Sequence, residues 1–267
     1  MRVEHVGTGD PVLAVVTTVH GDEVCGSKAL ERILAADPTV RRPYLAVVAN
    51  EAAHELGVRF VDEDLNRAFP GDRDADTHEG RLAAELLAEL DGLPVIDLHS
   101  TLSTPRPFAL YQQLTPTTRR LLAATGLSDA VDISHVPGGL VGCVDGVAVE
   151  CGLKGSEAAV DAAEDLIWNV LAAFGVVDRR HADGDPTVFE VTETVAGTGY
   201  EFLGENFTAV ERGTPFARRG DDELVAETDF YPVLMSTDGY DDMVGFGATR
   251  LGKLSSLGAN EPDADDE

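Results

Sequence analysis

The chain has 267 residues, enough for one large α/β domain or for such a domain with a small second one. Its 48 acidic and 20 basic residues give a formal net charge of −28, and only three of the basic residues are lysines: Lys28, Lys154 and Lys253. Because nucleic acids and anionic membrane surfaces repel such a protein, the charge argues against both as partners.

The acidic residues are spread along the chain and are not confined to a tail. Such a lysine-poor, acidic composition around an ordinary share of hydrophobic residues favours a halophilic source, where salt screens the repulsion among carboxylates. We therefore expect the midpoint of thermal unfolding to rise as KCl is increased to molar concentration. A midpoint that stays constant or falls would contradict a halophilic origin.

The cysteines and the N-terminus bear on location. Cys25, Cys143 and Cys151 are odd in number and follow no metal-binding spacing, which favours a reducing intracellular setting. The N-terminus has no basic-then-apolar signal pattern, and no apolar run approaches 18 residues. We expect a cytoplasmic protein that makes no membrane contact.

The first motif follows an apolar segment. Residues 11–19 (PVLAVVTTV) predict a buried strand, and the amphipathic stretch that ends near Asp37 predicts a helix. His20 and Glu23 lie at the turn between them, where Gly21 allows a tight bend. An imidazole and a carboxylate supply two of the three protein ligands of a catalytic zinc site. Taken alone, the spacing is better explained by a solvated glutamate near a partly buried histidine.

The second motif, residues 59–70 (RFVDEDLNRAFP), follows a strand predicted at 42–50. It has no amphipathic period, so we expect a loop. Asn66 and Arg67 offer neighbouring donors that suit a substrate carboxylate, and Arg59 could stabilise charge on a carbonyl oxygen. Equally, the arginines could pair on the surface with nearby acids: Asp62, Glu63 and Asp64.

A third ligand-type residue, His99, ends the strand predicted at 93–98. The carboxyl ends of strands gather functional groups in open α/β sheets, and the first motif also lies at such an end. Alone, His99 would be a core histidine bonded to backbone. Two strand ends that each carry ligand-type residues favour a metal site with water in the fourth position, formed by His20, Glu23 and His99.

The strand predicted at 141–150 ends in Glu150. A carboxylate at the tip of a buried strand tends to have a raised pKa, which suits it to transfer protons to and from water. A capping or surface glutamate is the plainer interpretation of this segment by itself.

Helices predicted at 77–90, 116–125 and 156–174 alternate with these strands. This alternation predicts an α/β fold with a mixed, mostly parallel sheet covered by helices on both faces.

The pattern changes after residue 178. Residues 179–186 predict a linker, and short β-prone segments follow it at 187–194, 207–210, 223–228 and 231–235. We therefore predict a first domain at 1–178, a small C-terminal all-β domain at 186–255 and an acidic disordered tail at 256–267.

Together, the motifs resemble those of the succinylglutamate desuccinylase/aspartoacylase family, a branch of the zinc carboxypeptidase-like fold. The matching segments are VHGDE at 19–23, RFVDEDLNRAF at 59–69, DLHST at 97–101 and VECG at 149–152. The resemblance extends from Pro11 to about Tyr240.

The resemblance implies a zinc-dependent hydrolase that cleaves the amide bond of a small N-acyl amino acid. It assigns one Zn²⁺ per chain to the ligands already named and makes Glu150 the general base and acid. It also implies that Arg59 polarises the scissile carbonyl, that Asn66 and Arg67 hold the substrate carboxylate, and that Tyr240 reaches into the pocket from the C-terminal domain.

One departure and two alternatives stay open. Enzymes of the family specific for N-acetylaspartate carry a Tyr and an Arg just before the catalytic glutamate strand, whereas residues 134–144 (SHVPGGLVGCV) contain neither. Specificity for aspartate therefore does not follow. The same ligands and carboxylate clamp would serve a metallocarboxypeptidase acting on peptide C-termini, and a zinc-binding regulatory protein is the alternative from another class. The acyl group, the amino acid, the native metal and any homo-oligomer are not encoded in these motifs.

Overall fold

The computed structural model describes residues 1–237, 239 and 242–258. Within these residues the strands are β1 (Arg2–Val6), β2 (Ala14–Thr17), β3 (Tyr44–Val48), β4 (Val95–Thr101), β5 (Phe108–Tyr111), β6 (Asp129–Asp132), β7 (Gly146–Leu153), β8 (Thr187–Ala196), β9 (Glu201–Phe202), β10 (Pro215–Arg219), β11 (Asp222–Val225), β12 (Tyr231–Val233) and β13 (Met243–Lys253). The α-helices are α1 (Cys25–Ala35), α2 (Glu51–Leu56), α3 (Leu65–Ala68), α4 (His78–Glu89), α5 (Pro116–Thr125) and α6 (Glu157–Ala173).

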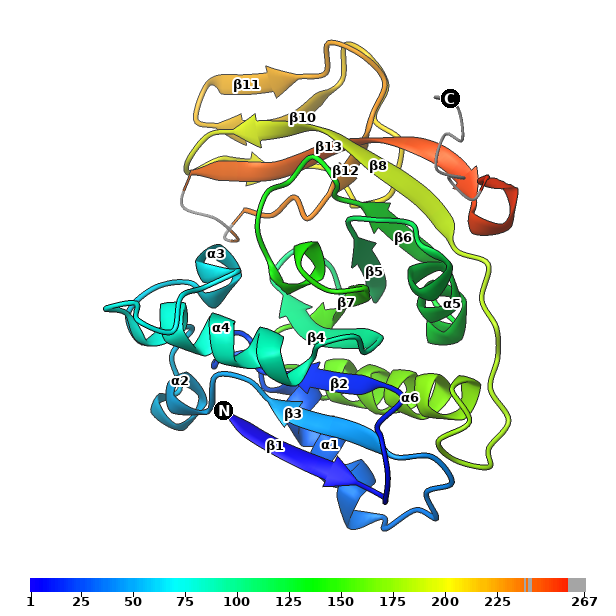
Figure 1. Ribbon diagram of the computed structural model, residues 1–267. Coiled ribbons are helices and arrows are strands. Elements are labelled where there is room, and N and C mark those ends of the chain that lie inside the picture. The colour runs from blue at the N-terminus through cyan, green and yellow to red at the C-terminus, as the bar shows by residue number, and fades with distance from the viewer. Residues whose placement is uncertain (238, 240–241, 259–267) are drawn as a thin grey trace, which may run out of the picture.

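The main sheet is mixed, as predicted. In the described chain its strand order is β1-β3-β2-β4-β7-β5-β6-β8-β13-β12 (Figure 1). Strands β3, β2, β4 and β7 run parallel to one another, and so do β5, β6 and β8. The pairs β1–β3, β5–β7, β8–β13 and β12–β13 are antiparallel. The predicted α/β class is confirmed.

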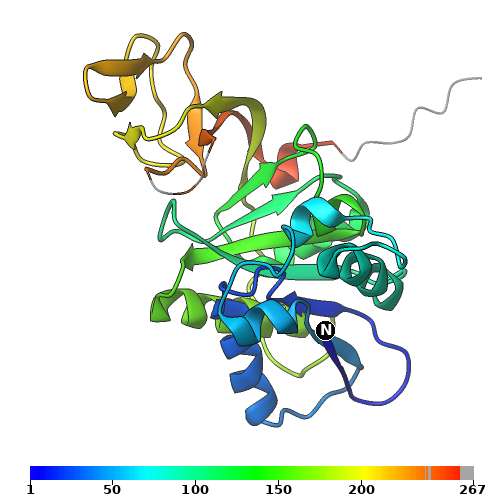
Figure 2. The ribbon, with the colours of Figure 1, turned by 90° about the vertical axis from the view of Figure 1, so that its left-hand side faces the viewer.

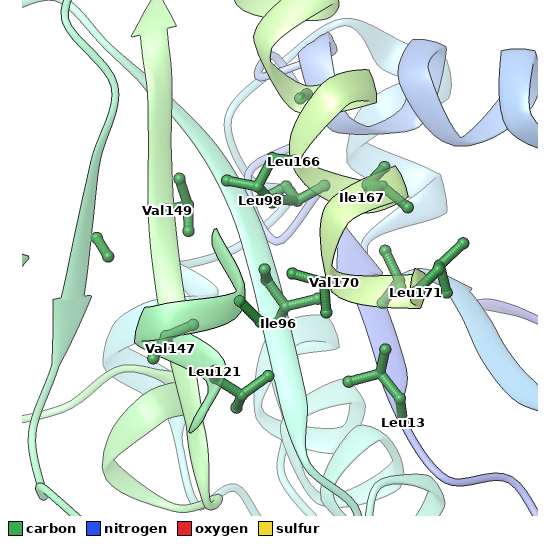
Figure 3. Packing of buried hydrophobic residues seen from close by; sticks show 14 of the residues in the cluster. Leu13, Ile96, Leu98, Leu121, Val147, Val149, Leu166, Ile167, Val170 and Leu171 are labelled. Carbon is green, nitrogen blue, oxygen red and sulfur yellow. The ribbon is translucent and has the colours of Figure 1, made fainter. Parts of the chain in front are cut away.

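Helices cover both faces of this sheet. Helices α1, α5 and α6 pack on one face, and α4 packs on the other together with the short α3 (Figure 1). Side chains alternate between the faces along each strand. In β4, Ile96 and Leu98 point toward α6, where they meet Leu166 and Val170 (Figure 3), so the intervening Asp97 points to the other face. Asp97 and His99 thus lie on the face opposite α6.

The core beneath α6 gives a stability prediction. Leu171 has no exposed surface, so Leu171→Ala is expected to lower the free energy of unfolding by about 2–5 kcal/mol through lost burial and the cavity left behind. The matched change Leu56→Ala, at a leucine that is 67% exposed, should alter it by less than ~0.5 kcal/mol. Urea denaturation followed by circular dichroism measures both, and equal effects would contradict this packing.

The C-terminal strands continue the main sheet. Strand β8 lies parallel to β6, and β13 and β12 follow it, while β9, β10 and β11 form a second sheet that stands apart from the helices (Figure 2). Residues 179–186 have no regular structure, as predicted for a linker. The division into domains at 1–178 and 186–255 stays a prediction, and residues 259–267 of the predicted tail lie outside the described residues.

Two strand predictions were wrong in detail. The segment 207–210 contributes only an isolated bridge from Val210 to Phe230, and the strand predicted at 141–150 begins at Gly146. In the latter case Leu140–Gly142 form a 3-10 helix, and the backbone N–H groups of Gly142 and Cys143 donate to the oxygens of Gly139 and Leu140 and not to a neighbouring strand. No helix in the described residues is long and apolar enough to cross a membrane.

Candidate active site

Three neighbouring parallel strands bring the functional residues together. His20 and Glu23 follow β2, while His99 lies in β4 and Glu150 in β7. The register of β4 and β7 pairs His99 with Glu150 directly. Because β2, β4 and β7 are parallel, their carboxyl ends meet at one edge of the sheet, which is where the predicted site lies.

The three predicted metal ligands converge. His20, Glu23 and His99 each offer a ligand atom, and these atoms lie within 4.8 Å of one another. The Nδ1 atom of His20 is 2.8 Å from Glu23 Oε1, and that of His99 is 3.0 Å from Glu23 Oε2. All three side chains are buried. No fourth His, Cys, Asp or Glu in the described residues joins the group, so the donor set fits an open zinc site with three protein ligands.

The far nitrogen of each histidine faces a second carboxylate. His20 Nε2 is 3.1 Å from Asp64 Oδ1, and His99 Nε2 is 2.8 Å from Asp97 Oδ2. Carboxylates in this position fix the orientation of a ligand histidine and leave its other nitrogen for the metal. The sequence predicted only surface pairing with an arginine for Asp64, and its contact with His20 had no local signal.

The cluster is electrostatically suited to a cation. Burial favours the neutral form of Glu23, but the charges of His20 and then His99 outweigh it and hold the pKa of Glu23 well below its ordinary value. Burial likewise opposes charging of His99, yet Asp97 and Glu23 raise the pKa of that imidazole well above its ordinary value. The buried carboxylates therefore hold positive charge between them, which protons or a metal ion can supply.

Glu150 has a different environment. Burial, followed by the nearby charge of Glu23, raises the pKa of Glu150 to about 7. Its Oε2 atom is buried and has no hydrogen-bond partner in the described chain. A carboxyl group whose pKa lies near neutrality can both take and return a proton.

Arg59 lies against the metal ligands. It donates to Glu23 Oε1 at 3.1 Å and to Asp64 Oδ2 at 3.0 Å, and one of its nitrogens is 2.9 Å from His20 Nε2. Burial opposes its charge, but Glu23 and Asp64 raise the pKa of the guanidinium. The site thus holds a positive group beside the ligands.

The loop that carries Arg59 is held by hydrogen bonds to Glu79, which lies in the first turn of α4. The buried carboxylate of Glu79 accepts from the backbone N–H groups of residues 61, 62 and 63 at 2.7, 3.0 and 3.2 Å. It also accepts from Asn50 Nδ2 at 2.9 Å. Burial opposes the charge, but these donors keep the pKa of Glu79 below its ordinary value. The conformation of the loop therefore depends on one distant carboxylate.

Replacing this carboxylate is expected to loosen the loop. Glu79→Gln turns an amide donor toward backbone donors, so the free energy of unfolding should fall by about 1–3 kcal/mol. Since the pKa of Glu79 is lowered, its contribution is present above the ordinary pKa of the carboxyl and is lost as pH falls through the lower folded value. Unfolding curves at pH 7 and pH 3 measure the difference, and the exposed Glu89→Gln on the same helix is the control. A difference as large at pH 3 as at pH 7 would contradict this role.

Asn66 and Arg67 line a cavity beside the ligands. The backbone N–H of Leu140 donates to Asn66 Oδ1 at 3.3 Å, which fixes the amide and leaves its Nδ2 hydrogens for another partner. Arg67 bonds to the backbone oxygen of Asn66 and has no carboxylate partner in the described residues. The cavity of about 150 Å³ is also lined by His20, His99 and Glu150, and it shares several lining residues, Arg67 and Glu150 among them, with a second cavity of about 620 Å³. Tyr240 lies outside the described residues.

Comparisons with known proteins agree with this site. Residues 10–135 match the model of the succinylglutamate desuccinylase/aspartoacylase catalytic domain. Over 249 residues the chain is 24% identical to a succinylglutamate desuccinylase of Vibrio vulnificus, covering 79% of this chain and 72% of that protein. Over 104 residues it is 30% identical to a probable aspartoacylase of a Nostoc species, covering 33% and 35%.

Solved structures share the fold. The product-bound ectoine utilization protein EutE (DoeB) from Ruegeria pomeroyi superimposes with a TM-score of 0.74 at 22% identity, covering 93% of this chain and 87% of that one. A succinylglutamate desuccinylase/aspartoacylase from Rhodobacter sphaeroides gives 0.72 at 20% identity, covering 93% and 89%. By the matched catalytic-domain residues and the named relatives, the chain is similar to the succinylglutamate desuccinylase/aspartoacylase family, whose fold it shares.

Proposed function

We propose that the chain is a zinc-dependent hydrolase that cleaves the amide bond of a small N-acyl amino acid. The observation that carries the proposal is the convergence of His20, Glu23 and His99 beside Glu150, at a cavity that also holds Arg67. A structural metal site would need neither the proton-transfer group nor the free arginine. The proposal also has the support of the family, whose named members are a desuccinylase and aspartoacylases.

His20, Glu23 and His99 would hold one Zn²⁺ per chain, which when bound supplies a Lewis acid for the carbonyl and for water. Glu150 takes a proton from the attacking water and returns it to the leaving amine, a transfer suited to its pKa of about 7. Arg59 stabilises the negative charge that develops on the carbonyl oxygen.

The remaining residues position the substrate. Arg67 and the Nδ2 group of Asn66 bind its free carboxylate, which fixes the scissile amide beside Glu150. Tyr240 is proposed to reach the same pocket from the C-terminal strands. Cys25, Cys143 and Cys151 form no disulfide, which supports the proposed cytoplasmic location.

The test is hydrolysis of a panel of N-acyl amino acids and dipeptides in molar salt, with added zinc and with a chelated control. Zinc-dependent release from acyl-amino acids, with dipeptides untouched, is the expected result. Cleavage of dipeptides alone would replace the proposal by the metallocarboxypeptidase. A zinc-loaded protein that cleaves neither class would favour the zinc-binding regulatory protein.

A further inference from the structure

Most of the cavity beside the metal ligands is apolar. Its polar lining includes Arg67, Asn66 and Glu150. The rest is bounded by an apolar wall that includes Leu110, Ile133, Val136, Val141, Ala148 and Phe246. An apolar cavity of this size, about 150 Å³, can enclose a group as large as benzene.

Strand geometry builds this wall next to the reacting groups. Ala148 precedes Glu150 by two residues in β7, so both point to the same face of the sheet. Leu110 of β5 pairs directly with Ala148. Ala148 therefore lines the cavity beside Glu150, and its small side chain leaves room there.

Residues 136–139, which line the cavity, form a loop that is held in place by hydrogen bonds and close packing. Gln112 Nε2 donates to the backbone oxygens of Val136 and Gly138 at 2.9 and 2.8 Å. Gly138 has a φ of +90°, and a Cβ atom there would lie 2.9 Å from the backbone oxygen of Asn66. The apolar residues of this loop are therefore held over the carboxylate-binding end of the cavity.

Among the described residues, the cavity has one basic side chain without a carboxylate partner, that of Arg67. Arg59 and Arg67 are the basic residues that line it in the described chain, and Arg59 is paired with Glu23 and Asp64. Residues 238, 240–241 and 259–267, which the structure does not describe, contain no Lys or Arg. Asp97 also lines the cavity, and its Oδ1 atom is buried and has no hydrogen-bond partner in the described chain. The negative charge of this side chain repels anions. A second substrate carboxylate inside this cavity would be buried without an unpaired basic side chain among the described residues.

We propose that the amino acid part of the substrate has a neutral, apolar side chain, such as that of leucine, methionine or phenylalanine, and is not aspartate or glutamate. This inference rests on the proposed deacylase function. The α-carbon of an N-acyl amino acid bears both the carboxylate and the side chain. In this proposal the carboxylate binds Arg67, the amide lies beside Glu150, and the side chain is assigned to the apolar wall.

The first experiment compares N-acetyl-leucine with N-acetylaspartate on the zinc-loaded protein. The expected kcat/KM is at least ~100-fold higher for N-acetyl-leucine, because a buried, unpaired polar group is discriminated against far more strongly than a missing methylene. An equal or higher value for N-acetylaspartate would overturn the inference and leave the deacylase standing. Absence of hydrolysis of any acyl-amino acid would instead refute the proposed function.

Two binding measurements test the inference even if no acyl-amino acid is hydrolysed. Calorimetric titration of the zinc-loaded Glu150→Gln variant should show tighter binding of N-acetyl-leucine than of N-acetylaspartate, and the reverse order would overturn the inference. Val136→Arg places a second positive charge at the half-buried edge of the wall and should raise the affinity for N-acetylaspartate relative to N-acetyl-leucine. The control Leu251→Arg, at an exposed residue of β13, should leave the ratio of the two affinities unchanged. If Val136→Arg also leaves this ratio unchanged, the side chain of the substrate does not lie against the apolar wall, and the inference is overturned.

Discussion

Glu150→Gln is expected to lower kcat by about 100- to 10,000-fold while the protein still binds one zinc ion per chain. The substitution keeps the size of the side chain and removes its ability to take a proton. Glu150 Oε2 has no hydrogen-bond partner among the described residues, so no structural bond is lost with the charge. A large loss of turnover in a folded, zinc-loaded protein would therefore come from proton transfer.

The measurement pairs the hydrolysis rate with the zinc content determined by atomic absorption. Glu85→Gln, at an exposed glutamate of α4, is the matched control and should retain the rate of the unmodified protein. A Glu150→Gln variant with an unchanged kcat would remove this residue from the mechanism.

Because the pKa of Glu150 is raised, the pH dependence of the free energy of unfolding gives a second test, made on the metal-free protein. A carboxyl whose folded pKa is about 7, against an ordinary value of 4.5, favours folding fully below the ordinary value. That contribution is lost as pH rises through about 7. Glutamine cannot ionise, so the stability of the Glu150→Gln variant relative to the unmodified protein should increase between those pH values. A relative stability that stays constant would show that this carboxyl is not buried as described.

Local pattern predicts that the metal ligands and Glu150 lie at the ends of strands, whereas their roles were predicted from the motifs taken together and from the resemblance to the family. Apolar runs of strand length stop at His20, His99 and Glu150, and parallel strands bring their carboxyl ends to one edge. The same pattern predicts the face that each residue occupies, since Asp97 and His99 alternate with Ile96 and Leu98. These features need no knowledge of distant contacts.

The second carboxylate on His20 could not be predicted in this way. Asp64 lies in an irregular loop. Its position depends on the hydrogen bonds that backbone N–H groups of this loop donate to Glu79, which lies in a helix further along the chain. The sequence shows acids beside arginines in that loop but does not show which acid turns inward. The distinction between surface pairing and orientation of a ligand is made by tertiary contacts.

Strand β13 was missed for a related reason. Its sequence, MVGFGATRLGK, has glycines in place of a continuous apolar run, and it is stabilised by pairing with β8, which lies some fifty residues earlier. Glycine weakens the local preference for a strand. The register shifts near Gly245 and Gly252 show that the strand bends at these residues, which a pattern of period two does not detect.

His99→Ala is expected to reduce bound zinc from one ion per chain to a small fraction of that value and to abolish hydrolysis. The structure leaves two donors, His20 and Glu23, and no other His, Cys, Asp or Glu in the described residues joins them. Two protein ligands do not make the three-ligand site that catalytic zinc requires. Zinc content after dialysis, together with the rate, measures this loss.

Asp97→Asn tests whether the carboxylate behind His99 contributes to that site. Asp97 is 1% exposed, and its Oδ2 atom lies 2.8 Å from His99 Nε2. Asparagine keeps the size and one acceptor but removes the charge that supports the imidazole, so zinc affinity should fall by about 10- to 100-fold. Competition with a chromogenic chelator measures the affinity, and Asp91→Asn, at an exposed aspartate, is the control. A zinc affinity equal to that of the control would mean that Asp97 only fills space. A loss of affinity that is smaller than that of His99→Ala would show that the charge of Asp97 strengthens zinc binding through His99.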